Sequence, residues 1–171
     1  MGVSFYAVLE YVMYDLPMSF GRVNISRDYE LFNAIAFGDG GITEGMPYPP
    51  RGLPPNLSLD SHDLFFTDPD AIKEYLEVSR FDDEEEATIE RYLEGWGEWA
   101  IREYRDIGSL PTPETYSHSW LNLNELKEAL AHRKLSIDKR PPDVKALIAA
   151  MEALAREYGS ENVRLVFCFG M

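Results

Sequence analysis

Two segments at opposite ends of the chain have the hydrophobic pattern of strands that are covered on both faces. Val3 to Met13 alternates, with Phe5, Ala7, Leu9, Tyr11 and Met13 on one face and Tyr6, Val8 and Val12 on the other. Asn162 to Phe169 repeats the pattern, with Val163, Leu165, Phe167 and Phe169 opposed by Arg164, Val166 and Cys168. Strands that are apolar on both faces are typical of buried sheet positions. We therefore predict that these two strands are neighbours at the centre of one sheet.

Between these strands, apolar residues at helical spacing predict at least four helices. The first begins near Ser26 or Asp28, whose side-chain oxygens can accept hydrogen bonds from free backbone N–H groups, and it ends by Gly38. The second runs from Asp70 to about Ser79. The expected buried faces are Leu31, Phe32 and Ile35 in the first helix and Ile72, Tyr75 and Leu76 in the second.

The third predicted helix is the longest. It starts at Asp82, and the acidic residues of its first turn complement the positive end of the helix dipole. Its apolar stripe consists of Ile89, Tyr92, Leu93, Trp96, Ala100 and Tyr104. Gly95 and Gly97 each weaken a helix interior by about 1 kcal/mol relative to Ala, so we predict a kink around Trp96.

The last two helices have clear terminal signals. Asn122, followed by Glu125, predicts a capping box for a helix that carries Leu123, Leu126 and Leu130. Pro141 and Pro142 pre-set the start of the final helix, and Gly159 can end it. The apolar positions of this final helix are Val144, Leu147, Ile148, Met151, Leu154 and Tyr158.

Length and composition are those of one folded domain. A hydrophobic content of 45%, with 13% aromatic residues, argues against a disordered chain despite the net charge of −14. We predict a single domain over residues 1–171 with an α+β fold. Its small, mainly antiparallel sheet contains the N- and C-terminal strands and is covered by about four to five helices. The longest loop, Gly38 to Pro55, holds five Gly and five Pro, and loops of this length are often functional.

The chain has no signal for export, a membrane span, a metal or a cofactor. It has no run of about 18 apolar residues, and Met1 to Phe5 lacks the basic-then-apolar order of a secretion signal. Cys168 is the only cysteine and lies between two Phe residues, which predicts a buried thiol in a reducing cytoplasm. The histidines lack partners at metal-ligand spacing, and Gly38 to Gly41 lacks the Lys-Ser/Thr of a phosphate-binding loop.

Negative charge is concentrated in residues 60–98, which contain fourteen Asp and Glu against Lys73, Arg80 and Arg91. Such a field repels nucleic acid, so we expect no direct binding of DNA or RNA. Three interpretations remain open. The surface attracts a basic partner protein, it imitates a phosphate backbone, or it is a solvated helix face that keeps the protein soluble.

Two clusters place an arginine where it can meet an anion. Arg27, Asp28 and Tyr29 open the first helix, where backbone N–H groups and a guanidinium can hold an anion, or where a cap and a surface ion pair form. Arg51 lies within Pro49 to Pro55, whose prolines stiffen the loop. Its guanidinium can bind a carboxylate or phosphate, or it can brace the loop against an acidic helix.

A third cluster, Ser117, His118, Ser119 and Trp120, follows Tyr116 and precedes a helix. A histidine between two hydroxyls suggests a general base beside a nucleophile. Adjacent residues of an extended segment point to opposite faces, however, so both serines are poorly directed toward the imidazole. This favours a structural histidine or a hydrogen-bond donor in a binding site, and it assigns no catalytic residue.

Four motifs together resemble a group of uncharacterised proteins of phages and prophages. They are Arg-Asp-Tyr-Glu-Leu-Phe (27–32), Pro-Arg-Gly-Leu-Pro (50–54), Ser-His-Ser-Trp-Leu (117–121) and Val-Arg-Leu-Val-Phe (163–167). In that group the third motif often begins with a second histidine, where this chain has Tyr116, and the last strand often ends in an acidic residue, where it has Gly170. The resemblance implies an accessory protein of a phage, located in the host cytoplasm, and supplies no activity.

Two hypotheses for function follow. The first is a non-enzymatic binding protein that acts on a host or defence component, as an inhibitor or in counter-defence, through the acidic surface of residues 60–98 or the loop around Arg51. The alternative is a protein in which Arg27, Arg51 and His118 converge on a small anionic ligand, such as a signalling nucleotide, for sequestration or hydrolysis.

Overall fold

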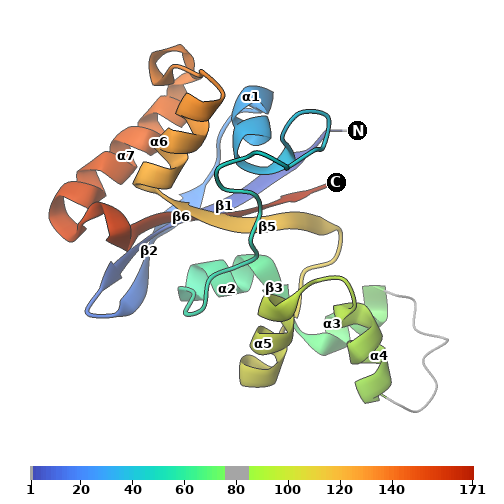
Figure 1. Cartoon of the computed structure of the whole chain (residues 1–171). Coiled ribbons are helices and arrows are strands. Elements are labelled where there is room, and N and C mark those ends of the chain that lie inside the picture. The colour runs from blue at the N-terminus through green and yellow to red at the C-terminus, as the bar shows by residue number, and fades with distance from the viewer. Residues whose placement is uncertain (1, 76–84) are drawn as a thin grey trace.

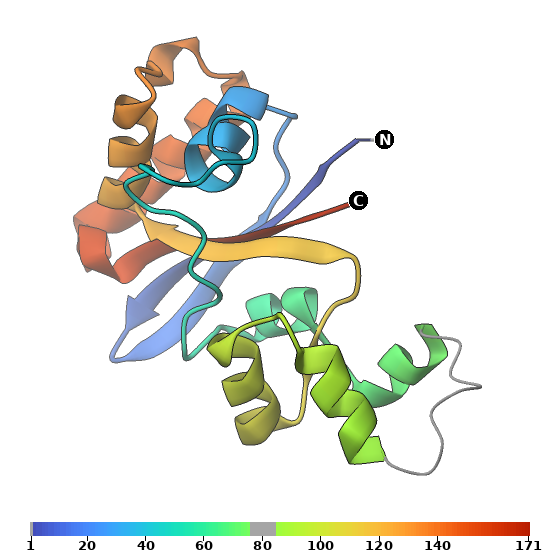
Figure 2. The same cartoon turned by 45° about the vertical axis from the view of Figure 1, so that its right-hand side comes forward.

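The computed structural model describes residues 2–75 and 85–171 and is built on a four-stranded antiparallel sheet with the strand order β2-β1-β6-β5. The strands are β1 (Ser4–Met13), β2 (Leu16–Val23), β5 (Thr115–Asn122) and β6 (Val163–Gly170). Helices cover both faces of this sheet, so the molecule has three layers (Figure 1 and Figure 2). The predicted α+β fold is confirmed.

The two terminal strands pair at the centre of the sheet, as their patterns predicted. β1 and β6 are antiparallel, from Ser4 opposite Gly170 to Tyr11 opposite Val163. Every residue of β6 except Arg164 is buried. Cys168 is among these residues, and burial raises the pKa of its thiol to about 12. The thiol is therefore protonated at neutral pH, as expected for a small core side chain.

One face of the sheet is covered by α1 (Tyr29–Phe32), a π-helical turn η1 (Asn33–Phe37), α6 (Leu123–His132) and α7 (Pro142–Tyr158). The core on this side is one large cluster to which the sheet contributes Ala7, Leu9, Leu121, Val163, Leu165, Phe167 and Phe169. Phe32 of α1 stacks on Phe5 with ring centroids 5.3 Å apart and meets Phe169 edge-on at 5.1 Å. We call this half of the molecule the α1/α6/α7 side.

The opposite face is covered by smaller pieces. They are α2 (Leu59–Phe65), α3 (Pro69–Tyr75), α4 (Glu85–Leu93), α5 (Glu98–Ile107) and a separate two-stranded sheet of β3 (Phe66–Thr67) and β4 (Leu110–Pro111). The apolar residues here form two small clusters, one against the sheet around Val8, Val166 and Phe65 and one between the helices around Ile72 and Leu110. Trp99 packs against both clusters and so links them. We call this half the α2–α5 side.

A buried carboxylate of the sheet, Glu10, holds α2 in place. Glu10 of β1 is fully buried, and its carboxylate accepts a hydrogen bond from Arg164 Nε at 2.7 Å. The same carboxylate accepts hydrogen bonds from the backbone N–H of Ser58, the N-cap of α2, at 2.8 Å and from the Ser61 hydroxyl at 2.6 Å. A buried charge is tolerated when it is paired and hydrogen-bonded in this way.

Local signals placed several helix termini correctly. Asp28 is the N-cap of α1, and the helical segment ends at Gly38, whose φ is 63°. Asn122 and Glu125 form the predicted capping box of α6. The final helix begins at Pro142 and ends before Gly159, whose φ of 91° a side chain would disfavour. The expected second helix corresponds to α3, and its predicted end near Ser79 lies outside the described residues.

The predicted third helix is wrong in one respect, because the structure contains two helices in its place. α4 ends at Leu93 and α5 begins at Glu98. Gly95 and Gly97 have φ angles of 84° and 99°, which a right-handed helix does not allow. The helix therefore ends and a second one begins, instead of one helix continuing through a kink. The predicted start at Asp82 lies outside the described residues.

Several elements were not predicted from the sequence, among them β2, β5 and α2. β2 pairs with β1 through a two-residue turn at Tyr14 and Asp15, both with positive φ, although the segment lacks the Gly that usually marks such turns. β2 contains Pro, Ser and Gly and is an edge strand, where interruptions of the apolar pattern are tolerated. α2 is a seven-residue helix in the segment that followed the long predicted loop.

Candidate binding site

The third sequence cluster lies on β5, where the strand departs from regular pairing with β6. Tyr116 is opposite Phe169 and Ser119 is opposite Phe167, so Ser117 and His118 together occupy the place opposite one residue of β6. Ser117 has a φ of 52°, as in a β-bulge. The expected strict alternation is therefore wrong at this point, and Ser117 and His118 line one cavity together.

His118 is buried and neutral. Its Nε2 lies 3.2 Å from Thr115 Oγ1, and that hydroxyl donates its own proton to the Thr112 carbonyl at 2.5 Å. Nε2 must therefore carry the ring proton and donate it to Thr115. Burial lowers the pKa of His118 to about 3, so the ring is uncharged at neutral pH. The low pKa favours a structural or binding role over that of a general base, because a general base works best with a pKa near the operating pH.

Aromatic rings surround the His118 imidazole on the α2–α5 side. Its centroid lies 4.9 Å from that of Trp99, 5.5 Å from Trp96 and 6.4 Å from Phe65. Trp96 and Trp99 meet edge to face, with an interplanar angle of 86°. Because Trp96 belongs to the break between α4 and α5, the two glycines of that break allow its indole to reach β5.

The loop after Pro50 fits closely against this aromatic group. The Gly52 N–H donates to the His118 carbonyl at 2.8 Å, and the Arg51 N–H donates to Ser119 Oγ at 3.3 Å. Gly52 has a φ of 81°, and a Cβ at this position would lie 2.2 Å from Trp99 Cδ1. Only glycine therefore allows the loop to approach Trp99 this closely.

A cavity of about 420 Å³ opens beside these rings. We call it the aromatic cavity, and its lining is Pro50, Gly52, Glu94, Gly95, Trp96, Trp99, Thr115, Tyr116, Ser117 and His118. A second hollow of about 500 Å³, the acidic groove, is lined by Glu90, Leu93, Glu94, Gly95, Gly97, Glu98 and Ile101. The two hollows share Glu94 and Gly95, so both are formed by the break between α4 and α5.

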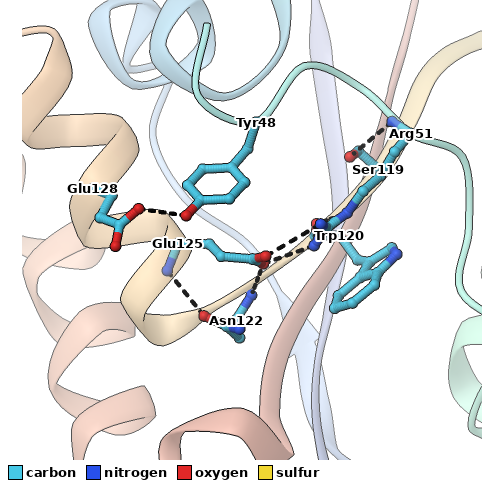
Figure 3. Close-up of polar contacts among 7 residues, drawn as sticks. All are labelled: Tyr48, Arg51, Ser119, Trp120, Asn122, Glu125 and Glu128. Atoms are coloured by element: carbon cyan, nitrogen blue, oxygen red, sulfur yellow. Dashed lines mark hydrogen bonds and ion pairs between the residues drawn. The ribbon is translucent and has the colours of Figure 1, made fainter.

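Arg51 is held by the protein itself and does not line the aromatic cavity (Figure 3). Its guanidinium lies 3.7 Å from the centre of the Trp120 ring and donates to the Trp120 carbonyl at 2.9 Å. It also forms a two-pronged ion pair with the Glu125 carboxylate at 3.1 and 2.7 Å. Tyr48 of the same loop donates to Glu128 of α6. Of the two interpretations of Arg51, the geometry favours a brace between the loop and an acidic helix.

The Arg27 cluster lies on the other face of the sheet. Asp28 is buried, and both of its carboxylate oxygens accept hydrogen bonds from Arg140, at 2.9 and 3.1 Å. The side chain of Arg27 lies beside Gly2, and Tyr29 is 52% exposed. Since α1 covers one face of the sheet and His118 packs on the other, Arg27, Arg51 and His118 do not share one cavity in the structure.

Several residues of the site were not singled out from the sequence. Trp99 lies outside the predicted apolar stripe, and Trp96 was assigned to it as an ordinary core residue. Thr115 had no signal, and Glu94 was included only as one of the acidic residues of the stretch 60–98. The pair of glycines around Trp96 was the one available indication, because a tryptophan between two positive-φ residues leaves the helix and becomes free to form a site.

Comparisons with models of known families, with curated proteins and with solved structures found no match. The resemblance of the four motifs to phage proteins therefore stays a prediction. Across residues 2–75 and 85–171 no helix has the length and apolar character needed to cross a membrane.

Proposed function

We propose that this protein is a non-enzymatic binding protein, encoded by a phage, that acts on a host or defence protein through its acidic groove. The phage source rests on the resemblance of the four sequence motifs. The observation that carries the binding role is the groove itself, a hollow whose three charged lining residues, Glu90, Glu94 and Glu98, are all acidic.

The composition of the groove favours a partner segment that is both basic and apolar. Glu90, Glu94 and Glu98 are exposed, while the partly exposed Ile101 and the largely buried Leu93 are the apolar side chains of the lining. Carboxylates around an apolar floor attract Lys or Arg at the rim and bury an apolar side chain at the centre. The surrounding stretch of residues 60–98 has a net charge of −11, which adds long-range attraction for a basic protein.

Pull-down from a host lysate at low and high salt tests this proposal when it is combined with two charge-matched variants. Glu90→Gln with Glu98→Gln removes two charges from the groove, whereas Asp138→Asn with Glu157→Gln removes two exposed charges from the α1/α6/α7 side. We expect a partner that binds wild type and the second variant at low salt, is lost at high salt, and binds the groove variant at least about tenfold less.

A partner that binds both variants equally would exclude the acidic groove as its docking site.

The alternative of a small anionic ligand is tested with the same proteins by thermal-shift screening against nucleotides. A nucleotide present at 100 times its dissociation constant would raise the free energy of unfolding by about 2.7 kcal/mol, which such a screen detects. A nucleotide that stabilises the protein would favour this alternative over the proposal.

A further inference from the structure

We infer that the aromatic cavity takes an arginine side chain of the partner that the acidic groove binds. This inference rests on the proposed function and makes it more specific. The two hollows then bind different parts of the partner. The acidic groove binds a basic and apolar segment, and the aromatic cavity binds one guanidinium.

The lining of the aromatic cavity has the chemistry that attracts a cation. Trp96 and Trp99 are partly exposed, and the face of an indole ring is the strongest aromatic partner for a positive charge. Glu94 is exposed and supplies a carboxylate. The third ring, His118, adds no opposing charge because the imidazole is neutral at physiological pH. An anion would meet Glu94 without a basic side chain among the lining residues to compensate it.

The protein already binds one of its own arginines in this way. The Arg51 guanidinium lies over the Trp120 ring and forms a two-pronged ion pair with Glu125, a combination of one indole, one guanidinium and one carboxylate (Figure 3). The aromatic cavity is lined by two indoles and a carboxylate, and the carboxylate is exposed to solvent. A guanidinium from another molecule would complete the same arrangement between proteins.

Arginine fits this lining better than lysine does. A guanidinium is planar, stacks on an indole and pairs with a carboxylate through two parallel hydrogen bonds, whereas an ammonium is a strongly hydrated point charge. A cavity of about 420 Å³ is larger than one arginine side chain requires, so the head group can enter together with part of its aliphatic stem.

Titration of the full chain with three peptides of equal length tests the inference. Their sequences alternate glycine with arginine, with lysine, or with citrulline, which has the shape of arginine without its charge. Tryptophan fluorescence follows binding, since Trp96 and Trp99 line the cavity. We expect the arginine peptide to bind about tenfold more tightly than the citrulline peptide and several-fold more tightly than the lysine peptide.

Two further variants assign the effect to the cavity. Glu94→Gln should weaken arginine-peptide binding about fivefold to tenfold, while the control Glu157→Gln, an exposed change of equal charge on α7, should leave it unchanged. Trp96→Leu should weaken it to a similar extent and reduce the fluorescence change. Glu94→Gln changes an exposed side chain and is expected to fold, so the test does not depend on the tryptophan variant.

Equal affinity for the arginine and lysine peptides, or equal weakening by Glu94→Gln and Glu157→Gln, would overturn the inference by showing attraction to net charge alone. The proposed function would still be supported by that result if the groove variant, Glu90→Gln with Glu98→Gln, failed to bind the salt-sensitive partner in the pull-down. If the partner instead bound the groove variant and the control variant equally, while the protein still preferred the arginine peptide, the acidic groove would be excluded as the docking site. The arginine site in the aromatic cavity would then still be supported.

Discussion

The two faces of the central sheet are covered in different ways, and the difference separates stability from binding. On the α1/α6/α7 side, the ten-residue α6 and the seventeen-residue α7 bury a single continuous cluster of apolar residues, and local signals define their ends. On the α2–α5 side, the core is divided into two small clusters linked by Trp99. Both hollows of the candidate site lie on this second side.

This contrast has a physical cause in the sequence. Long amphipathic helices bury a stripe that needs one continuous partner surface, and the central strands supply it. Glycines at 95 and 97 interrupt the apolar stripe of the other side, and the acidic groove lies at the break between α4 and α5. Surfaces with few buried contacts are the ones that can rearrange around a partner, as the proposed docking requires.

The largest expected effect comes from removing the strand that both sides share. Deletion of residues 164–171 removes most of β6, which pairs with β1 and with β5 and contributes to both cores. We expect no cooperative unfolding transition in circular dichroism and no soluble monomer. Removing the exposed Met171 alone is the control and should leave the transition intact. A truncated chain that is soluble and melts cooperatively would show that the sheet is not the common support of the two sides.

A matched pair of leucine substitutions measures the difference between the sides directly. Leu126 of α6 lies in the large cluster and is 1% exposed, and Leu93 of α4 lies in the small one and is 7% exposed. We expect Leu126→Ala to lower the free energy of unfolding by about 3–5 kcal/mol and Leu93→Ala by about 1–3 kcal/mol, since a loosely enclosed cavity collapses more easily. Urea denaturation measures both values. Equal losses would mean that the two cores are equally well packed.

Signals within a few residues of each other were sufficient to predict much of the α1/α6/α7 side. The capping box of Asn122 and Glu125 and the apolar period of α7 identify helices without knowledge of the fold. Long-range contacts were not predictable in the same way. Arg140 lies 112 residues from Asp28, and no local pattern shows that a buried guanidinium will neutralise this helix cap.

The same limit explains what was missed in the candidate site. His118 was recognised as a site residue, but its neighbours Trp96 and Trp99 come from a helix break that is separate in sequence. The bulge at Ser117 depends on how β5 pairs with β6, which the sequence of β5 alone does not determine. Arg51 was recognised as a residue held in position, and its partner Glu125 was identified for a different reason, as part of a helix cap.

A pair of glycine substitutions tests the close contact that shapes the aromatic cavity. Gly52 and Gly45 have φ angles of 81° and 82°, but a Cβ on Gly52 would clash with Trp99, whereas one on Gly45 meets nothing within 4 Å. Both alanine variants bear the cost of a positive φ, about 1–2 kcal/mol. We expect Gly52→Ala to lose about 1–2 kcal/mol more, with a shift in tryptophan fluorescence that Gly45→Ala does not show. Similar behaviour of the two variants would contradict the tight fit of the loop against Trp99.

A further expected effect is a pH dependence on the α2–α5 side that is specific to His118. Its pKa is about 3 in the folded protein against 6.5 as the ordinary value, because burial disfavours the charged ring. Below pH 6.5 the unfolded chain binds a proton that the folded chain excludes, so stability is complete above pH 6.5 and falls as the pH decreases toward 3.

Between pH 8 and pH 5 this linkage amounts to about 2 kcal/mol, which chemical denaturation at a series of pH values can measure. His118→Phe retains a buried ring and removes the titrating group, so its stability should change with pH by about 2 kcal/mol less than that of the wild type. The difference between the two proteins also cancels other groups in this range, such as Glu103, whose pKa burial raises. Parallel pH profiles would show that His118 reaches solvent and is protonated in the folded state, and the uncharged wall required by the aromatic cavity would then be lost.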